Sequence, residues 1–137
     1  MIALASARNV GGNKVAFVTA PIQDISFPND FDVVITPFLL DNFSEETLKV
    51  IFLKIDTSLA TKGLWLFCDF QNTAIWWQRT VLKIMYLFFR TFCGVEAEKL
   101  PHINEAFEQN SYTIKEEKAF ISGFVMARVY EKISHSL

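Results

Sequence analysis

Residues 31–35 (Phe-Asp-Val-Val-Ile) and residues 64–70 (Leu-Trp-Leu-Phe-Cys-Asp-Phe) decide the fold of this 137-residue chain. Both runs are almost continuously apolar, which is typical of strands whose sheet is covered by helices on both faces. Between them, Ser44 is a good N-cap, and Glu45 and Glu46 complement the positive end of a helix dipole. Apolar residues then recur at helical spacing, namely Leu48, Ile51, Phe52, Ile55 and Leu59. The sequence therefore predicts a strand, a helix packed on the sheet, and a second strand.

Gly63 is expected to end this central helix, and the segments outside it extend the pattern in both directions. In chain order we expect a helix over Met1–Asn9, a strand over Lys14–Thr19, a long aromatic helix over residues 75–95, a short helix from Pro101 to Asn110, and strands over Tyr112–Glu117 and Gly123–Tyr130. Lys115, Glu116 and Glu117 are typical of an edge strand, which places the final strand inside that edge. The order predicts an α/β fold in a single domain over residues 1–137, in which the C-terminal strands are antiparallel.

Composition narrows the classes of function. The chain is 51% hydrophobic, and its formal net charge of −2 gives no broad basic field for nucleic acid or anionic lipid. Two cysteines, Cys68 and Cys93, are too few for a disulfide scaffold and favour a reducing, cytoplasmic location. Residues 1–8 do not resemble a signal peptide. His102 and His135 have no clustered cysteine or carboxylate partners, so no metal site is predicted.

The aromatic segment over residues 75–95 approaches the length of a membrane span but carries several charges. On a helix, Arg79, Lys83 and Arg90 collect on one side and leave a wide apolar face. This pattern predicts an amphipathic helix that does not span a membrane. The apolar face is expected to pack against the protein or a partner chain, and the alternative is binding at a membrane interface.

The order and spacing of these segments resemble the type 11 and type 12 groups of class I S-adenosylmethionine-dependent methyltransferases. The resemblance rests on Asp32 opening one strand, Gly63 preceding the next, and Asp69-Phe70 leading into a helix. In that family seven strands lie in the order three, two, one, four, five, seven, six, with the last strand antiparallel. The resemblance implies an incomplete Rossmann-like sheet of strands three to seven, with Lys14–Thr19 as strand three. The glycine-rich loop and the acidic residue that binds the cofactor's ribose have no counterpart in the sequence.

The resemblance also implies where the functional residues lie. The candidate contacts to S-adenosylmethionine are Pro21, Ile22 and Gln23 after strand three, and Thr36, Pro37 and Phe38 at the end of strand four. Asp69 is the catalytic candidate, as a base or as a group that orients the acceptor, and its alternative role is to cap the following helix. The candidate substrate-binding residues are Trp76, Trp77 and Arg79. The two tryptophans could stack on a ligand or simply pack in a core or interface, and Arg79 could bind an anionic substrate or lie on a solvated helix face.

Loss of strands one and two would leave strand four with an unpaired, hydrophobic edge at residues 33–35. This edge is expected to pair with residues 15–18 of the same chain or with a second copy in a homodimer. Alternatively, the chain is truncated and Met1 is an internal methionine. Two hypotheses for the function follow. The chain is a methyltransferase, or its C-terminal part, that acts on a small and fairly apolar acceptor, or it is a dimerising remnant that binds no cofactor.

Overall fold

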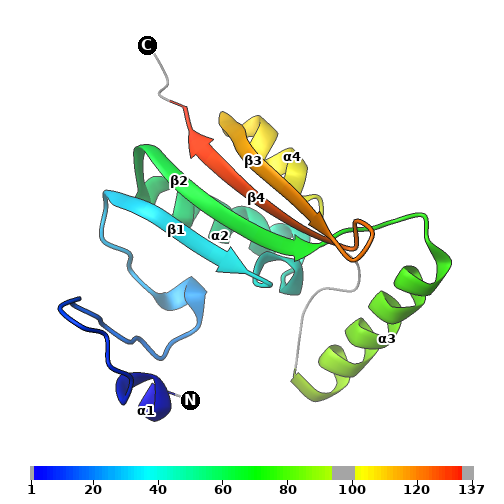
Figure 1. Ribbon diagram of the computed structural model, residues 1–137, viewed down its shortest axis with the longest axis horizontal. Coiled ribbons are helices and arrows are strands. Elements are labelled where there is room, and N and C mark those ends of the chain that lie inside the picture. Colours follow the sequence, from blue (N-terminus) through cyan, green and yellow to red (C-terminus); the bar gives the residue numbers. More distant parts are fainter. Residues whose placement is uncertain (1, 94–100, 134–137) are drawn as a thin grey trace.

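The computed structural model describes residues 2–93 and 101–133. The expectations that concern Met1, residues 94–95 and His135 lie outside these residues. The elements are α1 (Ile2–Ser6), the 3-10 turn η1 (Ile22–Asp24), β1 (Phe31–Pro37), the 3-10 turn η2 (Leu40–Asn42), α2 (Glu45–Ser58), β2 (Leu59–Phe70), α3 (Trp76–Cys93), α4 (Ile103–Gln109), β3 (Tyr112–Phe120) and β4 (Val125–Lys132). Figure 1 shows one four-stranded sheet, in the order β1-β2-β4-β3.

The strand pairings confirm the α/β fold with antiparallel strands at its C-terminal end. Strands β1 and β2 are parallel, with Ile35 opposite Leu66. Strand β4 is antiparallel to β2, with Val129 opposite Leu66, and forms an antiparallel hairpin with the edge strand β3. In the family's numbering, β1, β2, β4 and β3 correspond to strands four, five, seven and six. The sheet is therefore an incomplete Rossmann-like methyltransferase sheet.

The expected strand over Lys14–Thr19 is wrong, because these residues form no regular secondary structure and are exposed. Val15, Phe17 and Val18 favour a strand, but β propensity forms one only where a neighbouring strand and a buried face are available. In the described part of the chain, β1 pairs only with β2. The sheet thus contains strands four to seven and lacks strand three.

The expected role of Gly63 is also wrong. Helix α2 ends at Ser58, the chain enters β2 directly at Leu59, and Gly63 lies buried inside that strand. A Cβ atom on Gly63 would lie 2.7 Å from Leu59 Cδ1 and 2.8 Å from the carbonyl oxygen of Ala60. The glycine is needed here because the backbone approaches its neighbours closely.

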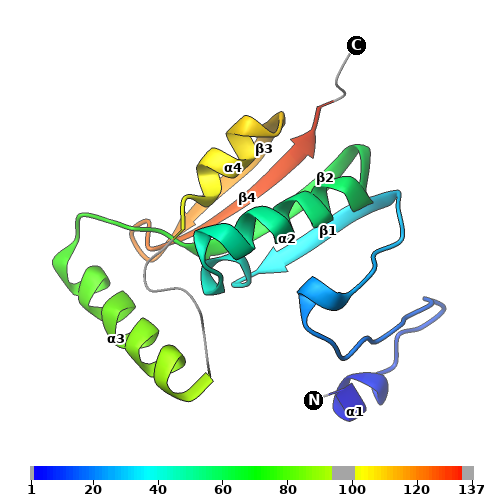
Figure 2. The same cartoon turned by 180° about the vertical axis from the view of Figure 1, so that it is seen from behind.

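The core lies between the sheet and helices α2 and α4, which cover the same face (Figure 2). The apolar residues predicted to line the buried face of the central helix are all buried, and the last of them lies in β2 and not in α2: Leu48, Ile51, Phe52, Ile55 and Leu59. Phe107 of α4 stacks on Tyr130 of β4 with ring centroids 3.8 Å apart and also meets the edges of Phe52 and Trp65. Ser44 caps α2 by accepting a hydrogen bond from the Thr47 N–H, as predicted.

Helix α3 stands beyond the carboxyl ends of β1 and β2 and covers neither face of the sheet (Figure 1). Its first turn is fixed by the buried Gln78, whose Nε2 donates to the Ile121 carbonyl at 2.9 Å and whose Oε1 accepts from the Thr73 hydroxyl. Much of its apolar surface is exposed, including Ile84 and Phe92. Among the described residues, no helix is long and apolar enough to cross a membrane.

Candidate functional site

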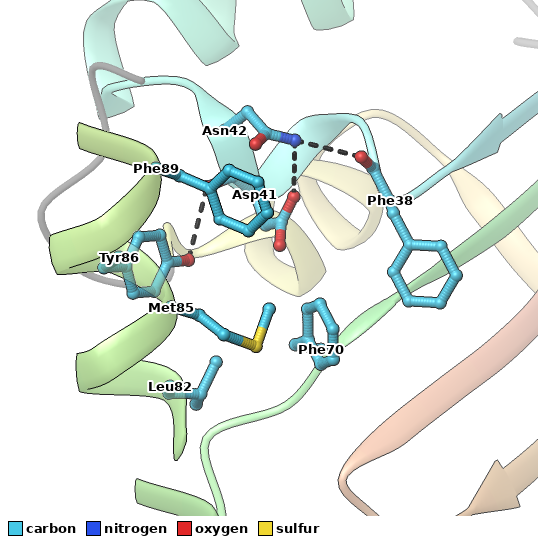
Figure 3. Close-up of a pocket in the computed structure, with 8 residues that line it drawn as sticks. All are labelled: Phe38, Asp41, Asn42, Phe70, Leu82, Met85, Tyr86 and Phe89. Atoms are coloured by element: carbon cyan, nitrogen blue, oxygen red, sulfur yellow. Dashed lines mark hydrogen bonds between the residues drawn. The ribbon is translucent and has the colours of Figure 1, made fainter. Parts of the chain in front are cut away.

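A cavity of about 390 Å³ lies between α3 and the residues that follow β1 and β2. Figure 3 shows the side chains that line it, which are Phe38, Asp41, Asn42, Phe70, Leu82, Met85, Tyr86 and Phe89. The first three come from the segment after β1, Phe70 ends β2, and the last four come from α3. Cavities of this size at the carboxyl ends of parallel strands are the usual ligand sites of α/β folds.

The segment after β1 is held in a tight turn that forms one wall of the cavity. Phe38 has a φ of +49°, and its N–H donates to the Cys68 carbonyl at 2.7 Å. The Asn42 side chain then donates from Nδ2 to the Phe38 carbonyl at 2.9 Å and to the Leu39 carbonyl at 3.2 Å. These bonds satisfy the polar groups of the turn and fix the position of Asp41 within it.

Asp41, which lines the cavity, forms a buried carboxyl pair with Asp69. The backbone N–H of Asp41 donates to Asp69 Oδ2 at 3.2 Å, and Asn42 Nδ2 donates to Asp41 Oδ1 at 2.9 Å. Asp41 is 7% exposed and Asp69 is 0% exposed. Burial, followed by the charge of Asp41, raises the pKa of Asp69 to about 8, and burial also raises the pKa of Asp41. Asp69 therefore keeps its proton at neutral pH, because two carboxyl groups this close do not both ionise.

Within the described part of the chain, no cation pairs with either carboxyl group. The nearest titratable groups are Tyr86, whose hydroxyl donates to the Asp41 carbonyl at 3.3 Å, and Cys68, which precedes Asp69. Burial and the nearby carboxylates raise the pKa of Tyr86, and burial and Asp69 raise the pKa of Cys68. The site thus presents aromatic walls and a buried carboxyl pair that no described cation accompanies. Such a site can accept a hydrogen bond or a proton from a ligand.

Of the sequence-predicted residues, Phe38 lines the cavity, and Asp69 does not line it but contacts Asp41, which does. The Asp69 side chain accepts hydrogen bonds from the Asp41 N–H and, at 3.1 Å, from the Phe70 N–H. Its partners are therefore in the turn after β1 and at the end of β2, and none is in α3. Thr36 is buried on the helix-covered face, where its hydroxyl accepts from Trp65 Nε1 at 2.8 Å, and Pro37 is exposed.

The predicted residues Pro21, Ile22 and Gln23 lie away from the cavity, beside α2. Lys54 of α2 donates to the carbonyl groups of Ile22, at 3.4 Å, and Gln23. Ile22 lines a second, shallower groove of about 240 Å³ along the free edge of β1, where Thr36 also contributes. The six cofactor candidates are therefore not together in the structure. Phe38 lines the cavity, and Ile22 and Thr36 line the groove at the edge of β1. The other three candidates, Pro21, Gln23 and Pro37, line neither.

Trp76, Trp77 and Arg79 are exposed and do not line the cavity. Trp77 packs against Phe124 with ring centroids 6.1 Å apart, and Trp76 is 78% exposed. The cavity wall is formed instead by the neighbouring helical face that carries Leu82 and Tyr86.

Sequence reasoning missed Asp41, Asn42, Met85, Tyr86 and Phe89. One signal was available for Asp41, because an acidic residue that follows the apolar run Phe38-Leu39-Leu40 is unusual unless it has a buried partner. The α3 residues carried no such signal, since their apolar pattern also fits ordinary packing. Among the described residues, no cluster of three or more His, Cys, Asp or Glu side chains could hold a metal ion.

Several solved structures with a similar fold are methyltransferases. The mitomycin 7-O-methyltransferase MmcR is similar over 82% of this chain and 32% of its own, with a TM-score of 0.61 and 12% identity. An O-methyltransferase family 2 protein from Planctomyces limnophilus, solved with apigenin, is similar over 83% of this chain and 33% of its own length, with a TM-score of 0.57 and 11% identity. Magnesium protoporphyrin IX methyltransferase from Synechocystis, solved with bound S-adenosylhomocysteine (SAH), is similar over 90% of this chain and 53% of its own length, with a TM-score of 0.60 and 16% identity.

No protein-family model and no curated protein matches the sequence. The chain spans about a third of the length of the first two of these structures and about half of the third. At these identities the likeness concerns the fold. Together with the strand order, it shows that this chain has the fold of part of a class I S-adenosylmethionine-dependent methyltransferase.

Proposed function

We propose that this chain forms the acceptor-binding part of an S-adenosylmethionine-dependent methyltransferase that acts on a small and fairly apolar molecule. The observation that carries the proposal is the aromatic cavity at the carboxyl ends of β1 and β2, which is lined by Asp41 of the buried Asp41–Asp69 pair. Ligands of open α/β sheets bind at these ends, and several structures similar to this chain are methyltransferases.

The described residues could supply only some of the contacts that a binding site for S-adenosylmethionine needs. S-adenosylmethionine would supply the methyl group, but the sequence has no glycine-rich loop and no acidic ribose contact. The Thr36 hydroxyl is engaged by Trp65, and Ile22 offers only apolar surface at the β1 groove. A complete cofactor site therefore requires groups beyond those described, which would lie along the free edge of β1.

The acceptor side is more complete in this chain. Phe38, Phe70 and Phe89 would contact an apolar body, and Asp41 would accept a hydrogen bond from its polar group. Asp69 would hold the shared proton and position Asp41 through the backbone hydrogen bond. Since methyl transfer depends largely on alignment of the two reactants, a fixed acceptor pocket would supply much of the rate enhancement.

Calorimetric titration of the purified 137-residue chain with SAH tests the cofactor part of this proposal. Micromolar binding would show that the chain, alone or as a dimer, completes a cofactor site. A folded chain that binds no SAH would overturn cofactor binding by this polypeptide. The experiment needs no acceptor, so it is independent of what occupies the cavity.

A second candidate function is a non-catalytic homodimer that binds no cofactor. It is favoured by the exposed apolar residues on β1 and α3, among them Ile35, Leu87 and Phe92. In this version the free edge of β1 or the outer face of α3 contacts a second copy of the chain. For both candidates we propose a cytoplasmic location, with which the free thiol of Cys68 is compatible.

A further inference from the structure

The cavity combines two features that favour one chemical class of ligand. Its walls carry the aromatic rings of Phe38, Phe70, Tyr86 and Phe89. Asp41, which is more than nine-tenths buried, lines the same cavity, and because Asp69 holds a proton at neutral pH, Asp41 is the member of the pair that can be ionised. Neither carboxyl group forms an ion pair with any residue that the structure describes.

A buried negative charge without a cation is costly, because water that would solvate it has been excluded. The shared proton and the Asn42 amide reduce this cost but do not neutralise the charge. A neutral hydroxyl ligand could donate a hydrogen bond and would leave the charge in place. An organic cation would neutralise it, and aromatic faces within about 6 Å would attract the same cation.

We propose that the ligand of this cavity is a protonated amine with a flat, apolar body, whose ammonium group pairs with Asp41 while its body contacts the aromatic walls. This inference rests on the proposed function, because it names the class of methyl acceptor. It predicts an amine nitrogen as the atom to be methylated: the lone pair of the neutral amine would form the N–C bond as the C–S bond of the sulfonium donor breaks, the sulfur would leave as a neutral thioether, and the positive charge would pass to the methylated nitrogen. Anionic ligands are excluded, since they would meet the charge of Asp41 in a site of low dielectric constant.

An ammonium group must lose a proton before its nitrogen can react, and the carboxyl pair can take that proton. The pair starts with one proton and one negative charge, and it ends with two protons and no charge, while the ammonium becomes a neutral amine. Desolvation lowers the pKa of the ammonium and raises the pKa of the carboxyl groups, which brings the two closer together. Asp41 contacts the ligand, and Asp69 is a positioning residue that shares the proton.

The test compares two probes of similar shape, phenethylamine and 2-phenylethanol, in calorimetric titrations of the 137-residue chain at pH 7 without a methyl donor. We expect the amine to bind at least tenfold more tightly than the alcohol. Equal affinity, tighter binding of the alcohol, or no binding of either probe to the folded chain would overturn the inference. The SAH titration is a separate measurement, so loss of the cofactor proposal and loss of this inference are distinguishable.

The variant Asp41→Asn is nearly isosteric and removes the charge, and we expect it to abolish the preference for the amine. Asp32→Asn is the matched control, because Asp32 is exposed at the start of β1 and does not line the cavity. An Asp41→Asn chain that folds and still prefers the amine tenfold would overturn the role of Asp41. If that variant does not fold, the comparison of the two probes on the unmodified chain decides the question.

Discussion

The backbone N–H of Asp41 donates a hydrogen bond to the side chain of Asp69 at 3.2 Å, although 28 residues separate them in the sequence. The bond joins the turn after β1 to the end of β2, so the buried carboxyl group of Asp69 contributes to the shape of the cavity as well as to its charge. A change in the protonation of Asp69 should therefore affect the stability of the fold.

Asp69→Asn should remove a pH dependence of stability. The pKa of Asp69 is raised to about 8 in the folded chain, so between about pH 4 and pH 8 the folded state binds more protons than the unfolded state. The free energy of unfolding should fall as pH rises through this range, by at most about 1.4 kcal/mol per pH unit from this group. Asparagine stays neutral and can still accept a hydrogen bond from the Asp41 N–H. The free energy of unfolding of Asp69→Asn should therefore change less with pH than that of the unmodified chain.

Urea unfolding of the two chains at pH 5, 6.5 and 8 measures this difference. Asp32→Asn serves as the control, because Asp32 is exposed. Identical slopes in the unmodified chain and in Asp69→Asn would show that Asp69 does not hold a proton in the folded state.

The sequence predicted the parallel pair β1–β2 and the helix between them because several independent signals agree there. The Ser44 cap, the apolar face of α2 and the two apolar runs all require the same arrangement. Lys14–Thr19 was mispredicted because it carries only one signal, β propensity, and none of the strands in residues 2–93 and 101–133 pairs with it. A strand depends on its neighbour, and the sequence of one segment does not reveal whether that neighbour exists.

The candidate site was predicted only in part for a related reason. Asp69 could be identified from its position at the end of an apolar strand, but its partner Asp41 depends on how the turn after β1 folds back. The aromatic pattern of α3 predicted an amphipathic helix correctly. It did not predict which face meets the cavity, since this is set by the contact of Gln78 with the distant Ile121 carbonyl.

Gly63→Ala should destabilise the chain. The added methyl group would overlap the Leu59 side chain and the Ala60 carbonyl, and backbone atoms cannot move aside cheaply. We expect a loss of about 1–3 kcal/mol in the free energy of unfolding, as is usual for overpacked sites. Gly12→Ala is the matched control, because nothing lies within 4 Å of the Cβ position there. Equal stabilities of the two variants in urea unfolding would contradict the tight approach inside β2.

Phe107→Ala should remove the centre of the aromatic core. Phe107 lies against Tyr130, Phe52 and Trp65, and its loss would leave a cavity between α4 and the sheet. The expected cost is about 3–5 kcal/mol. Phe88→Ala is the comparison, since Phe88 is exposed on α3 and should cost far less. Urea unfolding followed by near-ultraviolet circular dichroism measures both values, and similar losses would contradict this assignment of the core.

Ile35→Lys should weaken self-association if the chain forms the proposed homodimer through β1. Ile35 is 63% exposed, and in the described part of the chain β1 has one neighbouring strand, β2. A lysine at an exposed edge strand disfavours pairing with another chain because its charge would be buried at the new interface. Sedimentation equilibrium should show a concentration-dependent dimer for the unmodified chain and a shift toward monomer for Ile35→Lys.

Ile84→Lys tests the alternative contact, because Ile84 is exposed on α3. An unmodified chain that stays monomeric at hundreds of micromolar would exclude both contacts, and a dimer insensitive to Ile35→Lys but lost in Ile84→Lys would place the interface on α3.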